Sequence, residues 1–289
     1  MSAAIRVTDE PAFADQSEVE TCTVRQRSVG RVAIDVARMG RGSVVTRVAE
    51  GGPSRLRLPS VRDGAPEGVI INTAGGLASG DSITIEASLG PEAELVLTGA
   101  AAEKVYRSTG PTTHVATRLV LGERARLDWL PQETILFDRC RFRRRLDVDL
   151  PPSASALLFE ATVFGRQASG ESLTEGLFED RWRVRRGGRL VYADTFRLDG
   201  RLADLLVRPT IVAGNRALGT MLYLAPDAEA RIEEARECLA DSLSECGASA
   251  WNGLLAVRWV APSIGVLHRD VARFMTRFRA RPLPRVWNL

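Results

Sequence analysis

Short segments in which apolar and polar residues alternate fill most of the chain from Thr21 to about Leu224. Glycine or proline separates many of them, and Val, Ile, Thr and Leu are frequent inside them. This pattern is typical of half-buried β-strands and argues against alternating βαβ units. We therefore expect a mainly β fold, with many short, mostly antiparallel strands in stacked sheets. The expected strands cover residues 31–39, 42–50, 82–89, 93–99, 113–121, 124–130, 144–150, 155–164, 181–186, 190–198 and 210–214.

Charged residues occupy every second position from Arg139 to Asp149 in the segment RCRFRRRLDVDL. The positions between them are mostly apolar, and Arg144 is the charged exception. Side chains alternate between the two faces of a strand, so one face here is charged and the other mostly apolar. The charged face is either a solvated surface or a docking stripe for an acidic partner or RNA. Asp147 and Asp149 argue against RNA.

Helical periodicity replaces this alternation after about residue 225. A helix is expected to begin near Asp227 and to end at Gly247, a strand to cover residues 253–261, and a second helix to follow. The chain then divides into a flexible N-terminal segment (1–20), a β-rich body (21–224) and a smaller C-terminal α/β cap (225–289) packed on the body. The apolar stripes of the two helices are Ile232, Ala235, Leu239, Ser242 and Cys246, then Leu267, Val271, Phe274 and Phe278.

Composition describes a soluble chain. The 289 residues are 45% apolar and 26% charged, and the net charge of +3 does not by itself indicate a nucleic-acid partner. No apolar stretch is long enough to span a membrane, and the N-terminus does not resemble a secretory signal. We expect a cytoplasmic protein whose four cysteines are reduced thiols.

The stretch NTAGGLASGDS, residues 72–82, nearly spells a phosphate-binding loop. Gly75 and Gly80 have the required spacing, but Asp81 stands where such a loop needs a lysine, and its carboxylate would repel phosphate. A glycine-rich turn between strands is the simpler interpretation. Asp81 then either caps the turn or faces a polar cavity.

Ligands for a tight transition-metal site are scarce. His114 and His268 are the only histidines, and no CxxC, HxH or HExxH motif occurs. Carboxylates in apolar surroundings are more numerous. Each is more often a paired structural acid than a functional one, but several lining one interior would form a polar passage. These acids are Glu103, Glu133, Glu160, Glu171 and Asp194.

Lys104 is the only lysine in the chain. A buried lysine with a lowered pKa can form a Schiff base. Glu103 precedes it and Arg107 follows three residues later, which favours an ion-paired or partner-facing lysine.

Four blocks in register carry a family resemblance: NTAGGLASGD, AAEKVYRSTG, LDWLPQETILFDR and FGRQASGE. Together with the closing PRVWNL, they resemble the urease accessory protein UreD, or UreH, family from about Thr21 to the C-terminus. The matched motif positions are Gly75, Gly76, Gly80, Tyr106, Arg107, Ser108, Glu133, Gly165 and Arg166.

The resemblance implies a maturation factor and not an enzyme. Such a protein acts with UreF and the GTPase UreG on the apo-urease subunits, so that nickel enters the urease active site. It implies no tightly bound cofactor and only transient nickel, which carboxylates and water hold weakly. We expect Asp81, Glu103, Lys104, Glu160 and Asp194 to line or gate an internal polar route.

Two other functions remain open from the residues alone. One is a small-molecule enzyme that uses Lys104 with Glu103 or Asp81. The other is an RNA-binding protein that uses the arginine stripe near Arg141, although few aromatic residues lie beside it. The C-terminal helices, with an exposed-looking Trp287, either dock UreF or only cover the sheet.

Overall fold

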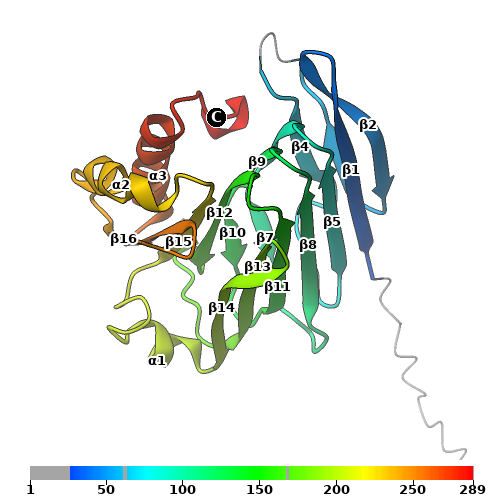
Figure 1. Ribbon diagram of the computed structural model, residues 1–289. Coiled ribbons are helices and arrows are strands. Elements are labelled where there is room, and N and C mark those ends of the chain that lie inside the picture. Colours follow the sequence, from blue (N-terminus) through cyan, green and yellow to red (C-terminus); the bar gives the residue numbers. More distant parts are fainter. Residues whose placement is uncertain (1–26, 61–63, 167–168, 289) are drawn as a thin grey trace, which may run out of the picture.

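Two stacked β-sheets make up most of the molecule (Figure 1). The computed structural model describes residues 27–60, 64–166 and 169–288. Strands dominate these residues, and the expected mainly β fold is confirmed. The segment 1–20, expected to be flexible, lies outside the described residues.

The first sheet contains seven strands in the order β14-β13-β11-β8-β5-β1-β2. Its strands run over Val29–Met39 (β1), Gly42–Gly51 (β2), Ser82–Leu89 (β5), Thr113–Leu121 (β8), Arg141–Leu150 (β11), Gly176–Arg186 (β13) and Arg189–Gly200 (β14).

The second sheet contains ten strands, eight of them in the order β16-β17-β15-β12-β9-β6-β4-β3, while β7 and β10 pair beside β12. Its strands run over Ser54–Arg57 (β3), Glu67–Asn72 (β4), Glu94–Gly99 (β6), Glu103–Val105 (β7), Arg126–Leu130 (β9), Thr134–Leu136 (β10), Ser155–Phe164 (β12), Ala217–Leu224 (β15), Glu245–Trp251 (β16) and Leu254–Ala261 (β17).

The chain winds between the two sheets like a flattened solenoid. From β4 to β13 the longer strands fall alternately in the ten-stranded and seven-stranded sheets, so successive coils lay parallel strands side by side. Nine of the fifteen pairings between described strands are parallel. The expectation of mostly antiparallel strands is therefore wrong, because alternation reports which face is buried and not the direction of the neighbouring strand.

The strand expected at residues 210–214 is also absent, since these residues form turns. The next strand, β15, begins at Ala217. The apolar run that suggested a strand instead packs Val212 into the core, where it is 1% exposed.

Apolar side chains fill two layers. One lies between the sheets, and the other lies between the outer face of the ten-stranded sheet and the C-terminal helices. Strand β12 borders both layers: Leu158 joins the first and Phe159 the second. Even-numbered side chains of β12 therefore point between the sheets.

Helices are few. Beside 3-10 turns at Glu229–Arg231 and Arg285–Asn288, the described residues form α1 (Leu202–Leu206), α2 (Ile232–Leu239) and α3 (Ile264–Arg279). The expected stripe of α3 is buried, and Ser263 caps its first turn by accepting a hydrogen bond from the Val266 amide. None of the described helices has the length and apolar character needed to cross a membrane.

Helix α2 is shorter than expected. It ends at Leu239, and Cys246 lies in strand β16 instead of on the helix. The buried Asp270 carboxylate accepts hydrogen bonds from the amides of Leu243 and Ser244. These bonds fix the turn between α2 and β16. Strands β16 and β17 then continue the ten-stranded sheet, so the C-terminal strands share the sheet of the body.

Trp287 is buried, contrary to its expected exposure. It is 4% exposed, and its indole Nε1 donates a hydrogen bond of 3.1 Å to the Leu130 carbonyl. Its ring stacks on His268 and contacts Phe159. The C-terminal tail therefore anchors α3 to the sheet, and Trp287 is not available as an interface anchor.

Replacing Trp287 by alanine should lower the free energy of unfolding by about 3–5 kcal/mol, because the change empties a buried aromatic site and removes one of the two hydrogen bonds to the Leu130 carbonyl, which keeps the one from Thr98. Chemical denaturation monitored by circular dichroism measures this loss. Trp251→Ala is the matched control, since Trp251 is 37% exposed at the edge strand β16 and should cost much less. Equal losses in the two variants would contradict the anchoring role.

Candidate functional site

The four motif blocks of the sequence meet at one end of the ten-stranded sheet. Leu77, in the glycine-rich turn, bridges Val105 of β7. Strand β7 pairs in parallel with β10, and β10 pairs in parallel with the end of β12. Leu77, Val105, Leu136 and Phe164 therefore lie in one row across the end of the sheet.

The glycine-rich turn needs its glycines. Gly75 and Gly80 have φ angles of 74° and 82°, in the left-handed region that favours glycine. A Cβ on Gly76 would lie 2.5 Å from the ring of Tyr106, whose hydroxyl donates a hydrogen bond to the Gly75 carbonyl. The motif glycines and the motif tyrosine are thus one packing unit.

Asp81 caps this turn. One carboxylate oxygen accepts a hydrogen bond of 2.7 Å from the Ala78 amide, and the other accepts one of 2.9 Å from the Ser28 amide. The side chain is 5% exposed. Of the two roles open from the sequence, the structure supports the cap.

Other motif residues hold the neighbouring loops. Ser108 hydrogen bonds to Ser79 and to the Pro111 carbonyl, and the Glu133 carbonyl accepts the Glu103 amide. Gly165 has a φ of 84° where a Cβ would lie 2.7 Å from the Glu171 carbonyl. Arg166 pairs with Glu171 and lies over the Phe137 ring, whereas Arg107 is exposed.

A cavity of about 230 Å³ opens beside these segments, between the two sheets. Its wall is apolar over much of its area, but carboxylate, amide and guanidinium groups gather on it. One of the buried polar atoms on its wall, Ser54 Oγ, forms no hydrogen bond among the described residues. Such an unpaired atom indicates a site for water or another polar occupant. The polar lining includes Ser54, Asn72, Glu103, Lys104, Thr117, Gln132, Thr134, Arg144 and Glu160.

Arg144 connects the two sheets at this cavity. It lies on the inward face of β11 and is 7% exposed. Its guanidinium forms two hydrogen bonds, of 3.2 and 2.5 Å, with Asp180, which lies directly opposite on β13. Across the gap between the sheets it donates to the hydroxyls of Thr134 and Thr162. A buried arginine with this many partners keeps its charge.

Glu160 is the second carboxylate beside Arg144. Its Oε2 lies 2.8 Å from Arg144 Nε, and its Oε1 accepts a hydrogen bond from Trp129 Nε1. Burial raises the pKa of the Glu160 carboxyl to about 7, although the Arg144 charge opposes this and the Asp180 charge adds to it. Asp180 takes the two-point contact with the guanidinium, and Glu160 contacts it at Nε alone.

Glu103 lies on the same cavity wall, on β7. Asn72 donates hydrogen bonds of 3.1 and 3.2 Å to its two oxygens. Burial raises the pKa of Glu103 to about 7; the Asn72 bond opposes the shift, and the negative charge of Asp81 adds to it. The cavity therefore holds two carboxyls that exchange protons near neutral pH.

The structure brings three of the five expected route residues to this cavity: Glu103, Lys104 and Glu160. The Lys104 side chain is exposed, and its carbonyl accepts the Leu77 amide. Asp81 lies in the adjacent turn. Asp194 lies elsewhere, on edge strand β14, where it pairs with Arg258.

Sequence reasoning missed Arg144, Asp180 and Asn72 as site residues. A signal for Arg144 was present, since it occupies an inward position of a strand whose other inward residues are apolar. Within the described ranges, no three His, Cys, Asp or Glu side chains cluster closely enough to hold a metal ion.

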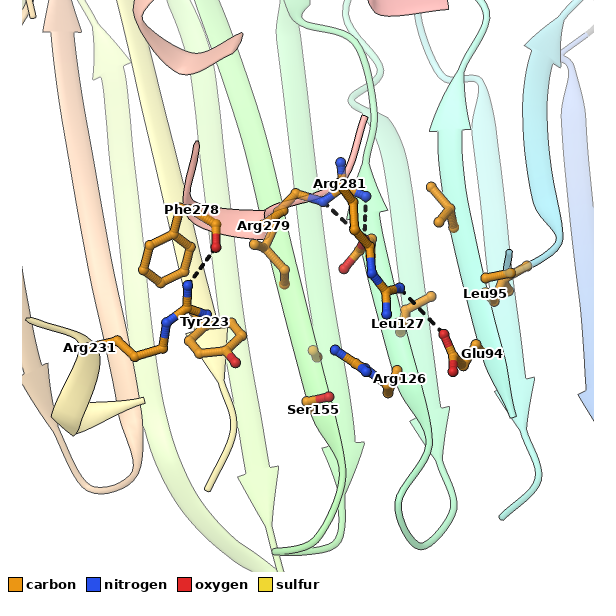
Figure 2. Close-up of a pocket in the computed structure, with 15 residues that line it drawn as sticks. Glu94, Leu95, Arg126, Leu127, Ser155, Tyr223, Arg231, Phe278, Arg279 and Arg281 are labelled. Atoms are coloured by element: carbon orange, nitrogen blue, oxygen red, sulfur yellow. Dashed lines mark hydrogen bonds and ion pairs between the residues drawn. The ribbon is translucent and has the colours of Figure 1, made fainter. Parts of the chain in front are cut away.

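A second hollow lies on the outer face of the ten-stranded sheet, beneath the end of α3 (Figure 2). Three of its four arginines are engaged: Arg279 binds Asp128 at 2.5 Å, Arg281 binds Glu94 at 3.4 Å, and Arg231 donates to the Phe278 carbonyl. These contacts fasten α3 to the sheet, so this hollow is explained by the fold.

The fold and the site define a mainly β protein that surrounds a partly polar cavity. The profile of the UreD urease accessory protein family matches residues 28–288. The chain is 53% identical over 265 residues to the urease accessory protein UreD of Azorhizobium caulinodans, covering 92% of this chain and 98% of that one. It is 53% identical over 278 residues to that of Xanthobacter autotrophicus, covering 96% of each. The chain belongs to the UreD family, which confirms the resemblance.

Glu160→Gln should flatten the pH dependence of stability. The pKa of Glu160 is raised in the folded state, so the stability due to its bound proton is complete below the ordinary value of 4.5 and is lost as pH rises to about 7. The part of the loss due to Glu160 amounts to up to about 3 kcal/mol and should disappear in the variant, whereas the part due to Glu103, whose pKa is also about 7, should remain. Urea denaturation from pH 4.5 to 8 measures it. The exposed Glu245→Gln should keep the wild-type profile, and an unchanged profile in Glu160→Gln would contradict the shift.

Proposed function

We propose that this chain is a urease maturation factor that acts with UreF and the GTPase UreG on apo-urease, and that nickel passes through the cavity between its sheets. Membership of the UreD family supports the role in maturation. The observation that carries the route is the pair of carboxyls, Glu103 and Glu160, on one cavity wall.

The cavity chemistry suits transfer and not storage. Carboxylates and water bind nickel weakly compared with clustered histidine and cysteine. Both carboxyls have a pKa of about 7, so a proton competes with a cation for each of them. Arg144 adds a fixed positive charge beside Glu160, which weakens cation binding further. An ion that enters such a cavity leaves it readily.

The described residues do not favour the alternative enzyme. A Schiff-base lysine is activated by burial in an apolar pocket or by a neighbouring cation. The Lys104 side chain is exposed, and no described arginine forms a contact with it. A compact ammonium at the cavity rim is consistent with a gate or a partner contact.

Urease maturation should depend on this chain. Cells that express the urease subunits, UreF, UreG and the remaining accessory proteins at limiting nickel should contain active, nickel-loaded urease only when the chain is present. Urease activity in extracts and nickel per purified urease measure the outcome. An equal nickel content of urease with and without the chain would contradict the proposed function.

The route makes a narrower prediction. Glu103→Gln and Glu160→Gln should each lower nickel per urease several-fold, because each removes a cation ligand from the cavity while keeping its shape. The accessory complex should still co-purify. Asp194→Asn is the matched control: it lies outside the cavity and should load nickel normally. Normal loading in both cavity variants would exclude the route and leave the maturation role intact.

A further inference from the structure

The outward face of four adjacent strands carries a surplus of arginine. On β8, β11, β13 and β14, eight outward arginines stand against four outward carboxylates. This local surplus exceeds the net charge of +3 of the whole chain. We call this surface the arginine face; it consists of Arg118, Arg141, Arg143, Arg145, Arg181, Arg183, Arg185 and Arg197, with Asp147, Asp149, Glu179 and Asp199.

The strand register places like charges next to each other on this face. Arg145 lies directly opposite Arg181 on the neighbouring strand, and its other neighbour is Ala116. Like charges at directly opposite positions destabilise a sheet. Arg145 reaches Asp147 only at 3.7 Å, and no described carboxylate forms an ion pair with Arg118, Arg181 or Arg185. The fold does not need these charges, because removing them would relieve repulsion.

Within the part of the chain that the structure describes, no helix covers the centre of this face. Helices α2 and α3 pack on the other sheet, and Figure 1 shows them away from β8 and β11. The side chains of Arg143 and Arg145 are 43% and 58% exposed. The face is therefore a flat, open and positively charged surface.

We propose that the arginine face docks the acidic surface of a partner protein. Its four carboxylates lie among the arginines, where they would repel nucleic-acid phosphates but can pair with basic side chains on a mixed protein surface. None of the outward residues named above is aromatic, so the face offers no ring for base stacking. The chemistry thus favours a protein rich in Asp and Glu over RNA.

The choice of binding probes rests on the proposed function. The probes are apo-urease and UreF, each purified and tested separately. The face variant is Arg145→Gln with Arg181→Gln, which removes the opposed pair and should not weaken the sheet. Arg145→Lys with Arg181→Lys keeps the charge. Arg208→Gln with Arg269→Gln is the control, since these exposed arginines lie elsewhere, form no ion pair with described residues and change the net charge equally.

Affinity is measured by biolayer interferometry at several salt concentrations after nuclease treatment. The wild type should bind one of the two probes with an affinity that falls as salt rises. The glutamine variant should bind that probe about five- to tenfold more weakly at low salt and show a shallower salt dependence. The lysine variant and the control pair should bind like the wild type.

Wild-type affinity of the glutamine variant for both probes would overturn the docking face, as would an equal loss in the control pair. Binding that nuclease abolishes would assign the face to nucleic acid and also overturn it. Urease activation by the wild type reports separately on the proposed function. If the wild type activates urease and the glutamine variant binds both probes with wild-type affinity, only the docking face is refuted. If the wild type binds a probe through the arginine face but does not activate urease, only the proposed function is refuted.

Discussion

The ion pair between Arg144 and the carboxylates of Asp180 and Glu160 determines how the two sheets meet. Taking a guanidinium out of water is costly, and only a complete set of partners offsets the loss. Strand β11 supplies the arginine and β13 supplies Asp180, while Glu160 and two threonines come from the opposite sheet. The sheets are thereby held at a distance that leaves a cavity on one side of the pair.

The winding of the chain explains why residues distant in sequence line that cavity. Each coil contributes one strand to each sheet, and the next coil adds its strands alongside in parallel. Residues in the same register on strands of successive coils therefore become neighbours. Thr134 of β10, for example, lies opposite Glu103 of β7 on one side and Thr162 of β12 on the other. A site built this way needs no local sequence motif for its own chemistry. The motif glycines shape only the turn between β4 and β5 and the segment after β12.

These two features also explain what the sequence could and could not predict. Alternation of apolar and polar residues located most strands, and helical periodicity located the buried stripe of α3. Both succeed because burial follows directly from the positions of apolar residues. Strand direction and the coil register depend on contacts between distant segments, so the parallel sheets were not predictable in this way. Glu103 and Glu160 stood out as acids in apolar surroundings. Their common cavity did not. Trp287 looked exposed because two of its partners, Leu130 and Phe159, lie more than a hundred residues away in the sequence.

The charged groups of the molecule fall into two sets, the buried groups at the cavity and the exposed arginines of the outer face, and the two sets are in different environments. Inside, burial raises the pKa of Glu103 and of Glu160 to about 7, so both carboxyls are near their protonation midpoint at neutral pH. Outside, arginines keep their charge at any physiological pH and act through solvent, where salt screens them. Partner binding through the outer face therefore leaves the protonation of the cavity unchanged unless the sheets themselves move. Arg144 is the group positioned to report such a movement, because its contacts to Glu160, Thr134 and Thr162 cross from one sheet to the other.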